Sequence, residues 1–221
     1  MSEELPLQHS VLGTFLLPIA QALRLLGLDP IETMADVGID AAKIANPDWR
    51  IRQEKFSALM AHCVQVSEEE AFGLLAAEQV QPQALHGLGF AWLASDTVYD
   101  GLKRLARFDK LVSTAADLRL VEEGELVLLQ LGRIPLTESF HFATRDYAIG
   151  MAARMCSLAL GDFLAPVKVE LERPLPEHPE RWESMLASRV SFGSDRSCMG
   201  WYRSDILEPL VTGDPQLARA N

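Results

Sequence analysis

Two arginines stand out because they lie in a segment that is otherwise apolar. Arg145 and Arg154 fall within residues 138–163, the stretch that predicts the longest helix of the chain. A guanidinium in apolar surroundings needs a partner, because burying an unpaired charge is costly. One interpretation is that either arginine binds the carboxylate of a small ligand through two parallel hydrogen bonds. The other is an internal ion pair with one of the 31 aspartates and glutamates.

Aromatic residues and one histidine form a second group of candidates. An apolar cavity with a few polar groups is the usual composition of a small-molecule site. Side chains suited to line such a cavity are Phe90, Trp92, Phe140, Tyr147, Trp201 and Tyr202. His86, next to Gly87, is suited to donate a hydrogen bond there, and ordinary core packing is the alternative for each of these residues. The predicted ligand-binding residues are therefore Arg145, His86, Trp92, Phe90, Phe140, Tyr147 and Arg154.

Sequence patterns typical of catalysis or metal binding do not occur. There is no G-x-S-x-G, no H-E-x-x-H and no Gly-rich phosphate loop. His62 and Cys63 are adjacent, and His86, His141 and Cys156 lack the tight pairing of a zinc site. A general base at His86 or His141 would lack a nucleophile at recognisable spacing. We expect no catalytic residue, no cofactor and no metal.

The net charge of the chain limits the kinds of molecule that it can bind. The 221 residues carry a formal net charge of -11, with a pI near 4.9. Such a surface argues against contact with a phosphate backbone. Four basic residues crowd one expected helix, Lys103, Arg104, Arg107 and Lys110. A solvated face or a dimer contact with an acidic patch is the favoured interpretation of that cluster.

Nothing in the sequence predicts export or a membrane span. The first ten residues, MSEELPLQHS, are acidic and lack the basic region of a signal peptide. The longest apolar run, residues 11–28, is interrupted by Pro18, Gln21 and Arg24. The cysteines, Cys63, Cys156 and Cys198, are odd in number and far apart, which indicates reduced thiols and a cytoplasmic location.

The elements that must position the candidate residues centre on residues 82–113, which predict two helices meeting at a corner. The first, residues 84–94, is apolar almost all round and should be buried. Gly87 and Gly89 let another backbone or a ligand come close to it. Residues 95–97 end this helix and offer N-cap oxygens to the next one.

Helices are also expected over residues 11–26, after Asp29, after Asp40, over 53–66, from the glutamates at 68–70, and over 177–187. Residues 117–122 and 125–131 predict a hairpin, and further strands are expected at 166–172, 189–193 and 198–202. No linker divides the chain. We therefore predict one α+β domain over residues 1–221, mostly helical, with a small antiparallel or mixed sheet in the C-terminal half.

The run LGFAWLASDTVYDGLKRLARFDKLVS resembles the signature of the ligand-sensing, arabinose-binding-like N-terminal domain of AraC/XylS-type transcription regulators. The earlier series GLDP, VGID and NPDWRI resembles the opening of that family, and the likeness extends over residues 12–217. At residues 199–201, Met-Gly-Trp stands where the family usually has a plainer apolar strand.

The resemblance implies an effector-binding and oligomerising domain. A small effector would bind in an internal cavity, two copies would form a homodimer, and DNA would be contacted only through a C-terminal helix-turn-helix domain that this chain lacks. An organic acid, an amino-acid-like molecule or an apolar carboxylate is the expected effector. A stand-alone carrier and a pure dimerisation module are the alternatives.

Overall fold

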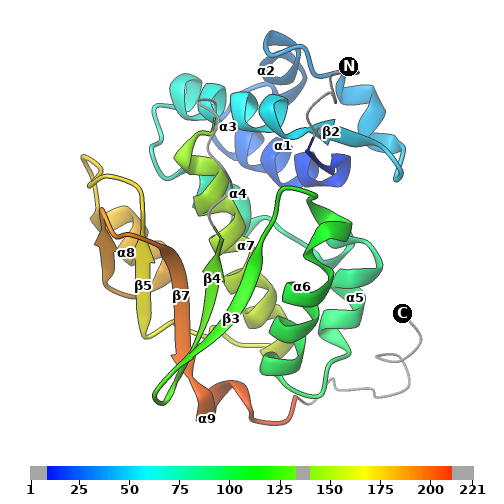
Figure 1. Ribbon diagram of the computed structural model, residues 1–221. Coiled ribbons are helices and arrows are strands. Elements are labelled where there is room, and N and C mark those ends of the chain that lie inside the picture. The colour runs from blue at the N-terminus through cyan, green and yellow to red at the C-terminus, as the bar shows by residue number, and fades with distance from the viewer. Residues whose placement is uncertain (1–8, 133–139, 211–221) are drawn as a thin grey trace, which may run out of the picture.

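The chain is mostly helical up to residue 113 and forms its main sheet after it. The computed structural model describes residues 9–132 and 140–210. In this part of the chain, the N-terminal helices lie above and to the right of a five-stranded sheet in Figure 1. The predicted α+β class, with a small mixed sheet in the C-terminal half, is confirmed.

The described chain begins with a strand where a helix is predicted. β1 (Ser10–Leu12) pairs antiparallel with β2 (Arg50–Arg52). The 3-10 turn η1 (Gly13–Phe15) then leads into α1 (Leu16–Leu25). The helix predicted from residue 11 therefore starts too early, because the strand partner lies far along the sequence.

Two aspartates cap the next elements, as predicted. Asp29 accepts a hydrogen bond from the N–H of Ile31 at 2.8 Å, at the start of α2 (Pro30–Asp36). Asp40 accepts one from the N–H of Ala42 at 3.0 Å, at the start of η2 (Ala41–Ala45). Side-chain oxygens in these positions satisfy N–H groups that have no partner within the helix.

The glutamate run does not open a helix, contrary to the prediction. α3 (Gln53–Ser67) ends at Glu68, which adopts the left-handed conformation with φ 53°. Glu69 accepts a hydrogen bond from the N–H of Ala71 at 3.0 Å, and α4 (Phe72–Glu78) starts after it. The run therefore forms the turn between two helices.

The predicted corner is present, but its first helix is divided. The 3-10 turn η3 (Pro82–Leu85) is separated from α5 (Gly87–Leu93) by His86, which has φ 52° and ψ -140°. A side chain on Gly89 would collide with the carbonyl oxygen of Pro82, so glycine permits this close fold-back. Thr97 accepts a hydrogen bond from the N–H of Asp100 at 3.0 Å and caps α6 (Val98–Val112).

The sheet has the strand order β3-β4-β7-β5-β6. β3 (Leu118–Glu123) and β4 (Leu126–Leu131) form the predicted hairpin, and Gly124 turns with φ 60°. β7 (Ser197–Tyr202) lies antiparallel to both β4 and β5 (Lys168–Leu171), while β6 (Val190–Phe192) is parallel to β5. The short helices α8 (Glu180–Leu186) and α9 (Arg203–Ile206) complete this half, with α8 beside β5 in Figure 1.

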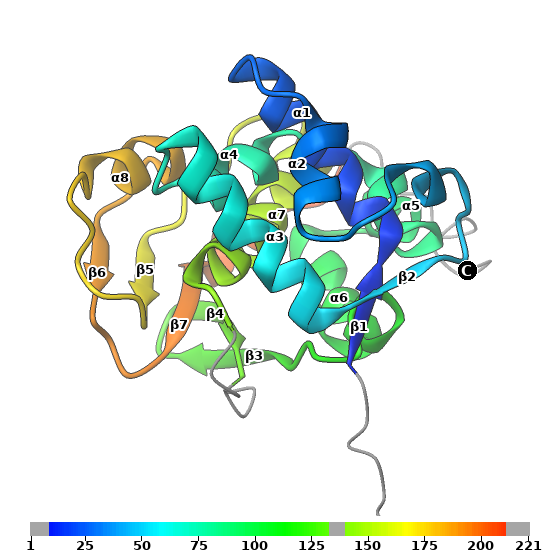
Figure 2. The ribbon, with the colours of Figure 1, turned by 90° about the horizontal axis from the view of Figure 1, so that it is seen from above.

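α7 (Phe142–Leu160) is the longest helix that the structure describes, and it runs through the middle of the molecule (Figure 2). Glycines let α4 pack closely against it. A Cβ on Gly73 would lie 2.9 Å from the Cβ of Asp146, and one on Gly150 would lie 2.6 Å from the Cβ of Ala77. The prediction of a central, largely apolar helix is confirmed, and its buried side chains join one core.

The described helices and cysteines bear on membrane spanning and on thiol chemistry. No single helix in the described ranges is long and apolar enough to cross a bilayer, and the one helix pair that passes jointly is bent by 118°. Cys63, Cys156 and Cys198 are free and buried. Burial raises the pKa of the Cys63 thiol to about 12, so this thiol stays protonated at neutral pH.

Candidate functional site

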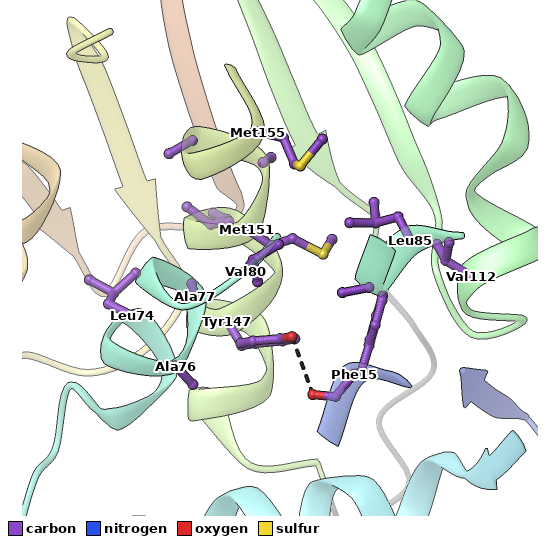
Figure 3. Close-up of a cluster of buried hydrophobic side chains, with 14 of the residues drawn as sticks. Phe15, Leu74, Ala76, Ala77, Val80, Leu85, Val112, Tyr147, Met151 and Met155 are labelled. Atoms are coloured by element: carbon purple, nitrogen blue, oxygen red, sulfur yellow. Dashed lines mark hydrogen bonds between the residues drawn. The ribbon is translucent and has the colours of Figure 1, made fainter. Parts of the chain in front are cut away.

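A first cavity, of about 80 Å³, lies beside the N-terminal half of α7. Residues of β1, η1, the start of α3, the end of α6, the start of β3 and the end of β4 line it as well. Its wall is mostly apolar and includes Val11, Phe15, Phe56, Val112, Leu131 and Met151. In Figure 3, Tyr147 and Met151 point from α7 toward Phe15, and the Tyr147 hydroxyl donates a hydrogen bond to the Phe15 carbonyl at 3.4 Å.

Two buried oxygens in the wall of the first cavity have no hydrogen-bond partner among residues 9–132 and 140–210. Gln53, the first residue of α3, is 6% exposed, and Thr144, in the first turn of α7, is 7% exposed. Neither the Oε1 atom of Gln53 nor the Oγ1 atom of Thr144 is paired. Because a buried polar atom without a partner costs about 1–3 kcal/mol, native structures contain few of them. Both residues line the first cavity, so their oxygens are hydrogen-bonding groups that no described residue satisfies.

Arg145 lies in the same wall and forms an internal ion pair. Its Nη2 atom is 2.5 Å from the Oε2 atom of Glu172, just after β5, and 3.4 Å from the carbonyl oxygen of Gly132. The ion pair that the sequence left open as an alternative therefore exists. Arg145 nevertheless lines the first cavity together with Phe140 and Tyr147, so three of the predicted residues come together.

Asp146 and Arg173, which follow Arg145 and Glu172 in the sequence, form a second ion pair in which the acid lies on α7 and the base follows β5. Asp146, which is 2% exposed, accepts a 2.5 Å hydrogen bond from Arg173, the residue after Glu172. Burial raises the pKa of Asp146 to about 6, although the charge of Arg173 opposes that rise. The Arg173 guanidinium also lies over the ring of Trp182, 4.1 Å from its centroid. Two consecutive ion pairs thus join the start of α7 to the end of β5.

The other predicted residues lie elsewhere. Arg154 lines a second cavity of about 380 Å³ between α4, α7 and α8. His86 lines a third of about 420 Å³ between α5 and α6. Phe90 is 54% exposed, whereas Trp92 is fully buried against Gly101. The seven residues therefore do not form one site.

The contact between His86 and Thr14 places a proton on the Nε2 atom of His86. Thr14 donates its hydroxyl proton to the carbonyl of Ala84 at 2.8 Å. The same hydroxyl oxygen is 3.3 Å from the Nε2 atom of His86. Since the hydroxyl proton is already used, Nε2 must carry the proton in this contact and donate it. His86 thus holds η3 against η1.

His141, the other histidine considered above as a general base, has a structural role in the described residues. His141 precedes α7, and its Nδ1 atom accepts a hydrogen bond from the N–H of Ala143 at 3.2 Å. Burial, with a contribution from the charge of Arg173, lowers the pKa of His141. In residues 9–132 and 140–210, no three His, Cys, Asp or Glu side chains gather as a metal site would require.

Sequence reasoning missed Gln53 and Thr144. Each is a single polar residue at the start of a helix, a position that usually faces solvent. Their burial depends on the packing of elements that are distant in sequence, α3 and α7 among them, and no local pattern indicates this.

The sequence profile of the arabinose-binding N-terminal domain of AraC transcription regulators matches residues 27–210. The chain belongs to this family. A curated relative, the ornithine utilization regulator of Pseudomonas aeruginosa, is 26% identical over 215 residues. That alignment covers 90% of this chain and 61% of the regulator, so the chain spans less than two thirds of its relative.

Solved structures agree on the fold of this AraC-family domain. The transcriptional regulator CdpR from Pseudomonas aeruginosa superposes with a TM-score of 0.62 at 13% identity, covering 94% of this chain and 60% of CdpR. An H-NOX variant superposes with a TM-score of 0.54 at 12% identity, covering 89% of this chain and 97% of the other. At such low identities, the two likenesses bear on the fold alone.

Proposed function

We propose that this AraC-family domain binds a small organic effector in the first cavity. It works in the cytoplasm as a homodimer, performs no chemistry, and regulates transcription through an attached helix-turn-helix domain. The chain spans only part of its regulator relatives, so the output of the whole regulator forms part of the proposal. Residues 1–221 serve as one sensing and oligomerising unit.

The unpaired oxygens of Gln53 and Thr144 carry this proposal. An acceptor such as Gln53 Oε1 calls for a hydrogen-bond donor, and the Thr144 hydroxyl can donate or accept. Apolar side chains around them would exclude water from the bound molecule, which strengthens each hydrogen bond. A pure packing core would be expected to hold apolar side chains at both positions.

The charge of Arg145 in the cavity wall, and that of its partner Glu172 outside the lining, favour one class of effector. Arg145 suits a carboxylate, but Glu172 already lies 2.5 Å from it. An incoming carboxylate would share the guanidinium with Glu172, and a ligand ammonium or hydroxyl group would then offset the added negative charge while donating to Gln53. An amino-acid-like acid is therefore favoured over a purely apolar carboxylate. The name of the ornithine utilization regulator is in keeping with that class.

The mechanism is a shift between two arrangements of the domain. The first cavity is bounded by α7, α3 and the β3–β4 hairpin, so a ligand there contacts elements from both halves of the fold. If one arrangement pairs Gln53 and Thr144 with the ligand better than the other, binding increases its population. An attached DNA-binding domain would respond to that change.

Native mass spectrometry on protein purified from its expression host tests the proposal. We expect a dimer with added mass, and denaturing extraction should release a small organic or amino acid. The paired variant Gln53→Leu/Thr144→Val should lose the added mass. A dimer without ligand, whose melting temperature no amino acid or carboxylate raises, would favour a dimerisation module. A ligand-bearing monomer would favour a stand-alone carrier.

A further inference from the structure

α7 separates two cavities on opposite sides of its axis. Thr144, Ala148 and Met151 face the first cavity, whereas Gly150, Ala153 and Ser157 face the second. With 3.6 residues per turn, these two sets fall on opposing helix faces. The second cavity is therefore a distinct site, and it does not depend on the function proposed for the first.

Arg154 is the cation of the second cavity. Its side chain is half-buried in the wall, and its Nε atom is buried without a hydrogen-bond partner. Within the described ranges, no salt bridge or hydrogen bond to Arg154 occurs. Because arginine remains protonated at any physiological pH, the cavity holds a permanent positive charge with N–H donors to offer.

Glu78, on α4, is the anion of the same cavity. Partial burial raises the pKa of Glu78. The positive charge of the nearby Arg154 opposes that rise. The two side chains nevertheless do not close into a salt bridge in the described structure. A carboxylate and a guanidinium thus face one cavity of about 380 Å³, within the range of small-molecule sites.

The remaining wall supplies an apolar surface. Leu74, Phe163, Met185 and Leu186 line it. Ser157 already donates to the carbonyl of Ala153 at 3.1 Å and accepts from the N–H of Leu164 at 3.3 Å. Gln79 adds an amide to the wall, and the charged groups that can recognise a ligand are Arg154 and Glu78.

We propose that the second cavity binds a small zwitterion with an apolar side chain. The ligand carboxylate binds Arg154, its ammonium binds Glu78, and its side chain packs on Met185 and Leu186. A simple anion would meet repulsion from Glu78, and a simple cation would meet repulsion from Arg154. Only a ligand with both charges matches the pair at once.

Methyl NMR of protein labelled with ¹³C-methyl methionine tests this site, because the two cavities carry different reporters. Met185 lines the second cavity and Met151 the first. The probes are norleucine, hexanoate and hexylamine, which share an unbranched alkyl chain and differ in their charged groups. Norleucine at millimolar concentration should shift the Met185 resonance, and the two single-charge probes should bind at least about tenfold more weakly.

Three variants complete the test. Arg154→Gln should weaken norleucine binding about tenfold or more. Glu78→Gln, at an exposed position, should preserve the fold and remove the preference for norleucine over hexanoate. Arg24→Gln, on the exposed side of α1, should change nothing. An unshifted Met185, a shift confined to Met151, or a norleucine response that survives Arg154→Gln would overturn the proposal.

Discussion

The guanidinium of Arg145 and the carboxylate of Glu172 lie 2.5 Å apart at the junction of α7 and β5. The next residue of each element forms a second pair, Asp146 with Arg173, also at 2.5 Å. Exposed fractions of the four side chains are 8%, 19%, 2% and 11%, so both pairs are largely shielded from solvent. This double contact joins a wall of the first cavity to the sheet.

Removing one member of the first pair should destabilise the domain. Glu172→Gln should lower the free energy of unfolding by about 2 kcal/mol or more, because it breaks a largely buried, charge-assisted contact with Arg145. Urea denaturation measures the change. Arg203→Gln, in a pair whose members are 45% and 50% exposed, is the matched control and should cost less than about 1 kcal/mol. Equal costs for the two variants would contradict the burial argument.

Asp146 should make stability depend on pH. Its pKa is about 6 in the folded chain, against an ordinary value of 3.8, so the folded state binds the proton more tightly. The contribution of the protonated Asp146 carboxyl to folding stability is complete below pH 3.8 and is lost as pH rises through about 6. The free energy of unfolding of the wild type, relative to Asp146→Asn, should therefore fall across this interval, by an amount on the order of 1 kcal/mol or more. If this difference in unfolding free energy rises or stays constant between pH 3.8 and about 6, the expectation is wrong.

Thr144→Val should stabilise the ligand-free domain. Valine has nearly the same shape and removes a buried hydroxyl that has no partner in the described part of the chain, so we expect a gain of about 1 kcal/mol. Thermal denaturation of extracted, ligand-free protein measures it. Thr97→Val, which removes the cap of α6, should instead lose about 1 kcal/mol. A loss at Thr144 would mean that its hydroxyl already has a stabilising partner.

His86 should tolerate glycine better than alanine. Both substitutions remove the hydrogen bond to Thr14, but only glycine adopts φ 52° and ψ -140° without strain. We expect His86→Gly to be more stable than His86→Ala by about 1 kcal/mol in urea denaturation. The reverse order would show that the backbone at this residue relaxes when the side chain is lost.

Local patterns predicted much of the fold and less of the site. The hairpin turning at Gly124 and the caps at Asp29 and Asp40 depend on neighbouring residues, so they could be predicted. The strand Ser10–Leu12 could not, because its partner Arg50–Arg52 is distant in sequence. The break at His86 likewise depends on the packing of Gly89 against Pro82.

The same distinction applies to the candidate residues. The apolar surroundings of Arg145 indicated that it would be buried, but its partner Glu172 is brought close only by the packing of α7 on the sheet. Arg154 lies on another face of the same helix, so it reaches the second cavity. Spacing along the chain predicted the helix, whereas the face that each arginine occupies decides which cavity it lines.

The affinity of the extracted effector for wild-type protein and for the Gln53→Leu and Thr144→Val variants tests the central claim most directly. Isothermal titration calorimetry should show binding weakened about tenfold or more in each variant, since each removes a hydrogen-bonding group from the first cavity. Arg24→Gln should bind like the wild type. Unchanged affinity in both cavity variants would contradict the account and place the effector elsewhere in the protein.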